Sequence, residues 1–213
     1  MASFNFKVLF TLILAALAAI VSSPARAEGQ SITVASRYFF TDFNAGSNEP
    51  VFNYSSNFRA PLGITGNWWM QYGSEAISRE IDLTGSKRLG PCTVMAGVYY
   101  TPDLDNFTIP TARFGCATNL AGINVGADTQ WYGGDLDDES RIGVSASHTF
   151  ELTGPADLDF GFKTSWFHSG PTTHAIEIGV PVGIGDDTTI RPYMQYGWGT
   201  GEDNFAAGFT VNW

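Results

Sequence analysis

Lysine is almost missing from this chain of 213 residues, which has only Lys7, Lys87 and Lys163. Charged residues of all four types make up 15% of the sequence. A soluble domain usually covers its surface with Lys, Arg, Asp and Glu, at about 25–35% of surface positions. The shortage argues against an ordinary surface in water. Glycine, with 24 residues, and aromatic residues, at 14%, are abundant instead, so hydrocarbon is the medium that this surface fits.

Long apolar runs are also missing, except for Val8–Val21 near the N-terminus. Lys7 precedes this run, and residues 25–27, Ala-Arg-Ala, form the small-x-small pattern of a cleavage site. This layout is that of a secretory signal peptide, and we expect residues 1–27 to be removed before Glu28. The run is shorter than the roughly 20 residues of an anchoring helix. If the remaining chain sits in a membrane, it must do so as a β-barrel.

Residues 28–213 are expected to form one domain, because no low-complexity linker and no helical periodicity interrupts them. Loss of Lys7 and Arg26 changes the formal net charge from −10 to −12. This acidic balance argues against nucleic acid as a partner.

Cysteine occurs twice, as Cys92 and Cys116. There is no C-x-x-C pair and no Cys/His cluster, so we predict no metal site of that type and no cofactor. Export to an oxidising compartment favours a disulfide. A hairpin that turns near Leu104 would place the two cysteines directly opposite each other, with Cβ atoms about 4.5–5.5 Å apart. We expect a structural staple rather than a redox switch.

What the sequence does contain is alternation of apolar and polar residues, with Gly, Pro, Asn and Asp between the alternating segments. This pattern predicts antiparallel β-strands, most of them with the roughly 9–11 residues that a tilted strand needs to cross a bilayer. The third and fourth segments are short and polar, so ten strands is the alternative to twelve. The twelve expected strands are 32–41, 51–59, 66–73, 77–84, 92–101, 107–118, 123–132, 141–152, 158–168, 174–184, 190–199 and 204–213.

The polar face of these strands decides between two architectures. In 174–184, for example, Ile176 and Ile178 share a face opposite Glu177. A soluble sandwich would bury the apolar faces between two sheets, whereas a membrane barrel turns them toward lipid and its polar faces toward the lumen. The polar faces here carry mainly Gly, Ser, Thr, Asn and Gln with isolated charges, which suits a confined interior. We therefore predict an all-β protein with a closed antiparallel transmembrane barrel, with outer loops longer than the periplasmic turns.

Six basic and six acidic residues are expected to point into the lumen. They are Arg37, Arg59, Glu80, Asp82, Arg113, Asp128, Arg141, Glu151, Asp159, Lys163, Glu177 and Arg191. Two interpretations remain open: a salt-bridge network that fills a narrow interior, and a constriction that selects solutes by charge. The candidate selectivity residues are Arg37, Arg59, Arg113, Asp128, Lys163, Glu177 and Arg191. Outside the lumen, Arg79 is expected at the headgroups, and the pairs Trp68-Trp69 and Trp131-Tyr132, with Trp166, Trp198 and Trp213, are expected in aromatic girdles.

The last ten residues, NFAAGFTVNW, alternate strictly and end on tryptophan. This segment resembles the aromatic-ended signal that the assembly machinery reads in bacterial outer-membrane β-barrels, and ITVASRYFFTDFNAGSNEP and MAGVYYTPDL resemble small porins of the TorF type. The resemblance implies a location in the bacterial outer membrane, with membrane lipid, lipopolysaccharide and the barrel assembly machinery as partners. It also implies an assembly signal made of Phe205, Phe209, Val211 and Trp213.

Catalysis has one candidate, His168 beside Ser169 in SWFHSG. A nucleophile and its base must lie within hydrogen-bond reach, but neighbouring residues on a strand point to opposite faces. We therefore expect no enzyme, and we expect His168 and His174 near the membrane interface. The acidic run 135–139 lacks the pattern of a calcium-binding EF-hand loop and is expected to be a solvated loop.

The function that these observations favour is a small porin, which lets small solutes diffuse passively through a narrow charged lumen. Three alternatives remain open: a plugged structural or adhesion barrel without transport, an outer-membrane lipid hydrolase, and a soluble secreted β-sandwich.

Overall fold

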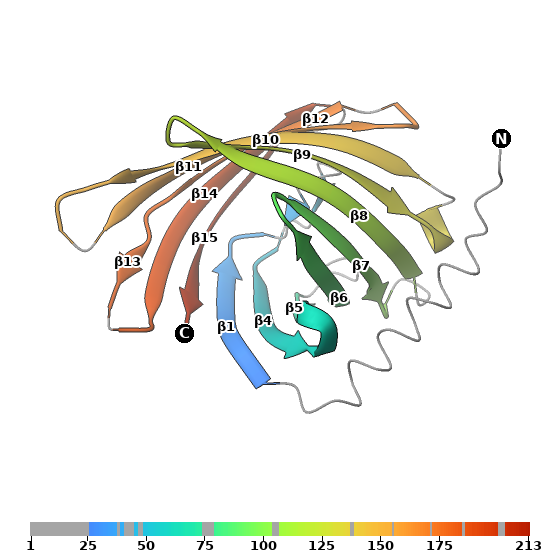
Figure 1. The fold of residues 1–213 in the computed structure, drawn as a ribbon, viewed down its shortest axis with the longest axis horizontal. Coiled ribbons are helices and arrows are strands. Elements are labelled where there is room, and N and C mark those ends of the chain that lie inside the picture. Colours follow the sequence, from blue (N-terminus) through green and yellow to red (C-terminus); the bar gives the residue numbers. More distant parts are fainter. Residues whose placement is uncertain are drawn as a thin grey trace.

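Twelve long antiparallel strands dominate the computed structural model of this protein (Figure 1). The residues that the structure describes are 26–37, 39–40, 45–46, 49–73, 79–103, 107–136, 139–154, 156–170, 172–184, 186–199 and 203–213. The predicted signal peptide, residues 1–27, lies outside them apart from Arg26 and Ala27. No helix in the described ranges is long and apolar enough to cross a bilayer.

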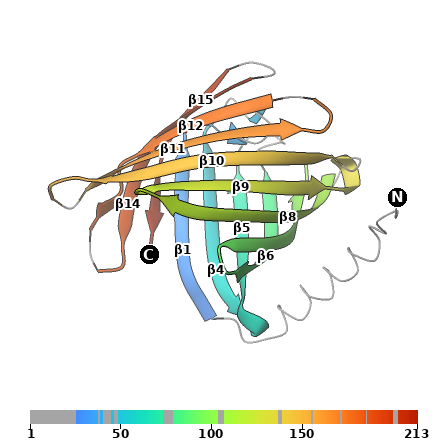
Figure 2. The same ribbon diagram turned by 45° about the horizontal axis from the view of Figure 1, so that its top comes forward.

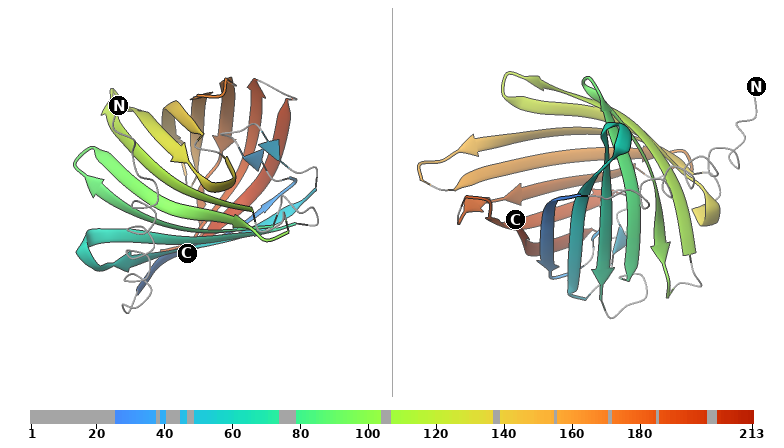
Figure 3. Two further views of the ribbon diagram at one scale, coloured as in Figure 1. Left: turned by 90° about the vertical axis from the view of Figure 1, so that its right-hand side faces the viewer. Right: turned by 60° about the horizontal axis from the view of Figure 1, so that its bottom comes forward.

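The strands join into one closed ring. They are β1 (Arg26–Ala35), β4 (Val51–Ala60), β5 (Ile64–Tyr72), β6 (Glu80–Leu89), β7 (Cys92–Thr101), β8 (Phe107–Leu120), β9 (Ile123–Tyr132), β10 (Ser140–Glu151), β11 (Asp157–Phe167), β12 (Thr172–Gly179), β14 (Thr189–Gly199) and β15 (Asn204–Asn212). Each pairs antiparallel with its neighbours in the chain, and β15 returns to pair with β1, where Val211 lies opposite Ile32. Figures 1 and 3 show these first and last strands side by side. The prediction of a closed twelve-strand barrel is confirmed.

In the described residues, five short elements accompany the twelve strands of the ring. They are β2 (Phe39–Phe40), which pairs with β3 (Ala45–Gly46), the two-residue strand β13 (Val182–Gly183), and the 3-10 turns η1 (Pro61–Gly63) and η3 (Gly134–Leu136). In the ring, β8–β11 form the wall opposite β1 and β4 (Figure 2). The end of the barrel where β1 begins and β15 finishes is called the turn end here, and the opposite end the loop end.

Burial in this protein is the reverse of burial in a soluble protein. Large apolar side chains on the outer faces are exposed, for example Ile142 at 59%, Trp166 at 44% and Phe209 at 43%. Polar and charged side chains on the inner faces are buried instead, including Gln130 at 2% and Arg141 at 1% exposed. A barrel that faces lipid requires this arrangement. The β-sandwich alternative is therefore wrong, because no pair of stacked sheets buries the apolar faces in the described part of the chain.

The first strand is the least accurate of the strand predictions. It was expected at 32–41, but β1 runs from Arg26 to Ala35, with a register shift between Ala27 and Gly29. Pairing with β4 and β15 decides its position: the backbone N–H of Gln30 donates to the Trp213 carbonyl at 2.9 Å. The aromatic pair Phe39–Phe40, which suggested a strand, instead forms the short hairpin with Ala45–Gly46.

The fourth strand was expected at 77–84 and lies at 80–89. The segment 85–91, which separates the expected strands 77–84 and 92–101, belongs mostly to β6, and Leu89 pairs directly with Cys92. Gly90 adopts φ = 63°, a left-handed conformation that glycine tolerates, and Pro91 follows it. The connection is therefore a two-residue turn, so this turn is no exception to the short turns expected at this end.

Candidate channel lumen

Charged residues from all around the ring meet inside the barrel, in the arrangement that strand alternation predicted. The lumen contains a cavity of about 380 Å³ toward the loop end and one of about 360 Å³ toward the turn end. A third space of about 240 Å³ is lined by Lys163 and Glu177. Three groups of side chains lie in and around these cavities.

The first group surrounds Arg141 at the start of β10. Its guanidinium is completely buried, with Nη1 2.8 Å from Oδ2 of Asp128. Nε donates to the Tyr132 hydroxyl at 3.1 Å, and Nη2 donates to Oε1 of Gln130 at 2.9 Å. Arg113 reaches the same Asp128 oxygen from β8 at 3.0 Å. With two arginines on one aspartate, this group carries a net positive charge.

The second group surrounds Arg191 on β14. Nε donates to Oδ2 of Asp159 at 3.1 Å, and Nη2 donates to Oε1 of Glu177. The side chain of Gln195 also donates to the Glu177 carboxylate. Two carboxylates on one arginine leave this group with a net negative charge. Each charge is paired, as buried charges must be.

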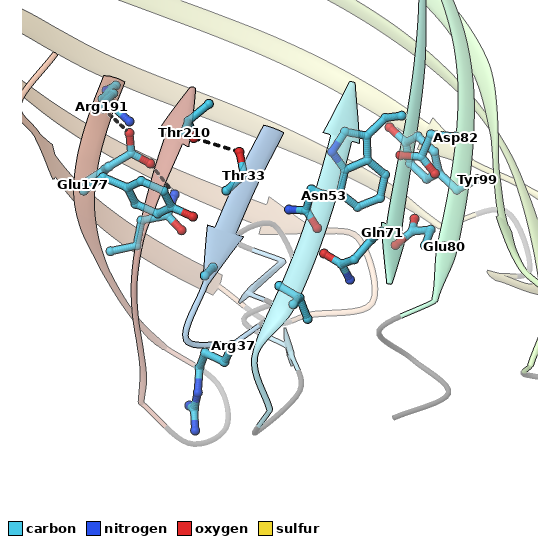
Figure 4. Close-up of a pocket in the computed structure, with 15 residues that line it drawn as sticks. Thr33, Arg37, Asn53, Gln71, Glu80, Asp82, Tyr99, Glu177, Arg191 and Thr210 are labelled. Carbon is cyan, nitrogen blue, oxygen red and sulfur yellow. Dashed lines mark hydrogen bonds and ion pairs between the residues drawn. The ribbon is translucent and has the colours of Figure 1, made fainter. Parts of the chain in front are cut away.

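The third group lies on the inner faces of β4–β7. Asn53, Gln71, Glu80, Asp82 and Tyr99 line the larger cavity on this side, and Figure 4 shows them along one wall, facing Glu177 and Arg191. We call these five residues the acid–amide wall. Gln71 is 3% exposed. Both amide atoms of Gln71 are buried with no hydrogen-bond partner among the described residues. The same is true of Oδ1 of Asn53 and Oδ1 of Asp82.

The predicted selectivity residues divide between these places. Arg37, Glu177 and Arg191 line the larger cavity, and Arg113 and Asp128 line the second. Lys163 lines the third space, whereas Arg59 is exposed at the turn end of β4. Whether these residues select solutes stays a prediction. The uncharged residues Asn53 and Gln71 were missed, although the same alternation of faces would have placed them inside.

Two of the aromatic residues expected in girdles point inward instead. Trp68 and Trp131 face outward and are 39% and 46% exposed. Their neighbours cannot share that face, because side chains alternate along a strand. Trp69 therefore lines the larger cavity, and Tyr132 is 1% exposed. The girdle prediction is wrong for these two residues.

Several other predicted residues lie on the outside of the barrel. Phe205, Phe209 and Trp213 are 52%, 43% and 42% exposed, and Val211 lies in the pairing of β15 with β1 and β14. The last strand thus completes the ring, and its role as an assembly signal stays a prediction. Arg79 directly precedes β6 at the loop end, and its Nη1 lies 2.6 Å from Oδ2 of Asp103.

Cys92 and Cys116 form the predicted disulfide between β7 and β8. The pairing predicted from a hairpin centred near Leu104 is confirmed.

The loop-end residue Ser169 bonds to Glu139 rather than to its neighbour His168. The backbone N–H of Ser169 donates to Oε1 of Glu139 at 3.3 Å, and its hydroxyl also bonds Glu139. No hydrogen bond joins Ser169 to the His168 ring in the described residues. Of the acidic run 135–139, residues 137 and 138 lie outside the described residues, and no group of three or more His, Cys, Asp or Glu in the described ranges could hold a metal ion.

Comparison with known proteins shows which solved structures have a similar fold. No protein-family profile and no curated protein matches the chain. Among solved structures, the KdgM porin is similar at 9% identity over 86% of this chain and 98% of that chain, with a TM-score of 0.53. The NanC porin is similar at 11% identity over 86% and 97%, with a TM-score of 0.52. A structure of the KdgM porin in complex with disordered oligogalacturonate gives 8% identity over 86% and 98%, with a TM-score of 0.53.

At these identities the likeness shows the fold. The chain has the closed antiparallel barrel fold of these outer-membrane proteins, as predicted. Within that class, its twelve-strand ring is similar to the barrels of two proteins described as porins. The predicted location in the bacterial outer membrane is consistent with this fold and with the apolar outer surface.

Proposed function

We propose that this protein is a small outer-membrane porin, through which small polar solutes diffuse passively. The observation that carries the proposal is the polar interior: a closed barrel with apolar side chains outside encloses cavities of about 380 and 360 Å³ lined by charged and amide groups. Such a lumen offers hydrogen bonds to a hydrated solute in place of water, and diffusion through it needs no catalytic step.

The fixed charges would set selectivity. Arg113, Asp128 and Arg141 form a positive group on β8–β10, while Arg191 with Asp159 and Glu177 forms a negative group on the adjacent strands β11, β12 and β14. Ion pairs hold these groups in place, so a solute meets charges that are already oriented. We expect Arg37 and Lys163 to act with them. In the outer membrane, lipid and lipopolysaccharide would surround the barrel, and the assembly machinery would bind the β15 segment.

A plugged barrel is the second candidate, because the completely buried Arg141 and its partners fill part of the lumen. In that case the network would stabilise the barrel and block conduction. The two functions differ in one measurable property, ion flow.

Single-channel recording tests the proposal. The full-length chain would be expressed in a Gram-negative host, extracted from its outer membrane with detergent and added to planar lipid bilayers. We expect discrete, reproducible current steps. Heat-modifiable gel mobility identifies the folded barrel, and heat-unfolded protein is the control. Bilayers that stay silent with folded protein would overturn the porin proposal and favour the plugged barrel.

A further inference from the structure

The acid–amide wall has the features of a binding site rather than of a structural network. Its residues come from four consecutive strands and face one cavity of about 380 Å³, a volume within the range of small-molecule sites, about 300–1,000 Å³. Figure 4 shows Gln71 between Asn53 and Glu80, with Asp82 and Tyr99 beside them.

Unpartnered polar atoms mark this wall. Buried polar groups in proteins almost always have a hydrogen-bond partner. Gln71 is 3% exposed, yet neither of its amide atoms bonds to any described residue, and the same holds for Oδ1 of Asn53 and of Asp82. By contrast, the buried amide of Gln130 on β9 bonds to Arg141, Thr111 and Tyr99. These atoms of the acid–amide wall are thus available to a molecule in the cavity.

The charge of the wall is negative. Glu80 and Asp82 lie two residues apart on β6, and both line the cavity, so two carboxyl groups are neighbours on this wall. Across the cavity, Arg191 is held by Glu177 and Asp159. Arg37 donates to Oδ1 of Asn204 at 3.1 Å. Both arginines that line the cavity therefore bond to groups outside the acid–amide wall.

The unpartnered atoms and the rings beside them define the chemistry of the ligand. Three of the four atoms are oxygens that accept hydrogen bonds, so a fitting ligand donates several. The aromatic side chains of Trp69 and Tyr99 line the same cavity, and aromatic faces attract organic cations. Carboxylate and amide oxygens also suit Ca²⁺ or Mg²⁺, but aromatic rings contribute nothing to such a site.

We propose that the acid–amide wall binds a small organic cation with several N–H groups, an alkyl ammonium or guanidinium compound, within the lumen. The carboxyl groups of Glu80 and Asp82 pair with its charge, the oxygens of Asn53 and Gln71 accept its N–H groups, and Trp69 packs against its carbon chain. This inference deepens the proposed function and rests on it for the route by which the cation arrives.

Channel block and direct binding test the site separately from the channel. The probe is 1,4-diaminobutane, added to single wild-type channels and, independently, titrated calorimetrically into detergent-solubilised protein. We expect the diamine to reduce the current. In Glu80→Gln/Asp82→Asn, the half-blocking concentration rises at least tenfold, because both carboxyl groups become amides of nearly the same shape.

The matched control is Glu151→Gln/Asp157→Asn, which removes two carboxyl groups that face each other at the turn end and leaves block unchanged. Gln71→Leu keeps both acids and provides a second variant if the double one does not fold. We expect it to weaken block by the diamine fivefold.

Equal block in wild type and in the variants would overturn the proposal, as would stronger block by Mg²⁺ than by the diamine. Diamine binding without any conductance would overturn the porin function and support the site.

Discussion

Two paired arginines of the lumen, Arg141 and Arg191, each lie beside a glycine whose missing side chain leaves room for the guanidinium. A Cβ on Gly143 would lie 2.5 Å from Nη1 of Arg141, and one on Gly179 would lie 2.5 Å from Cζ of Arg191. The alternation of faces predicts that both arginines point inward. It does not predict that Arg191 needs Gly179, because Gly179 belongs to the neighbouring strand β12.

Gly143→Ala should therefore destabilise the barrel. The added methyl group would also lie 2.9 Å from Oδ1 of Asp128, so the buried ion pair must shift, and overpacking of this kind costs about 1–3 kcal/mol. The urea midpoint of unfolding in detergent micelles measures the loss. Gly161→Ala is the control, because its nearest new contact is Cβ of Glu177 at 4.0 Å. An equal loss in both variants would contradict the packing argument.

Strand boundaries were predictable where turn residues mark them and unreliable where they do not. β7 and β9 lie at 92–101 and 123–132 as predicted, each after a turn with glycine: Gly90 before β7 and Gly122 before β9. β1 was misplaced by six residues, because the aromatic run after it looks more like a strand than its own glycine-containing start. Pairing with β4 and β15 outweighs that local preference.

A loop contact at the start of β10 should depend on pH. Burial opposes the charge of Glu139, but hydrogen bonds from the Ser169 hydroxyl and from backbone N–H groups outweigh it and hold the pKa of Glu139 below its ordinary value. A lowered pKa means that the contact is fully present above the ordinary glutamate pKa, about 4.3, and is lost as pH falls through the lower folded-state pKa.

NMR titration of the Ser169 amide measures this effect. We expect its chemical shift to change with a midpoint below about 4.3 and to stay constant in Glu139→Gln. A midpoint at or above the ordinary value would show that the carboxylate does not hold the loop.

At the scale of the whole molecule, the decisive property is which face of the sheet meets lipid. Val144 and Ser145 are neighbours in the middle of β10. Val144 is 37% exposed on the outer surface, whereas Ser145 lines the lumen spaces. The same substitution therefore places a side chain in lipid at Val144 and in the polar lumen at Ser145.

Val144→Arg should destabilise the barrel by about 2–4 kcal/mol, because the charge must enter the hydrocarbon region. Ser145→Arg should fold as well as the wild type and change the channel current, since its charge enters the lumen. Unfolding in lipid vesicles, monitored by tryptophan fluorescence, measures both. The reverse order of stability would show that the apolar face does not meet lipid.

The sequence by itself determined the all-β class and the alternation of faces along each strand, and it favoured twelve strands over ten. These follow from the period of two along an extended chain, which is a local property. Tertiary structure alone decided which inward groups meet: that Arg141 and Arg113 share Asp128, that Arg191 takes two carboxylates, and that Asn53, Gln71, Glu80 and Asp82 line one cavity. The physical reason is that those contacts depend on strand register and on the closure of the ring, which no single strand specifies.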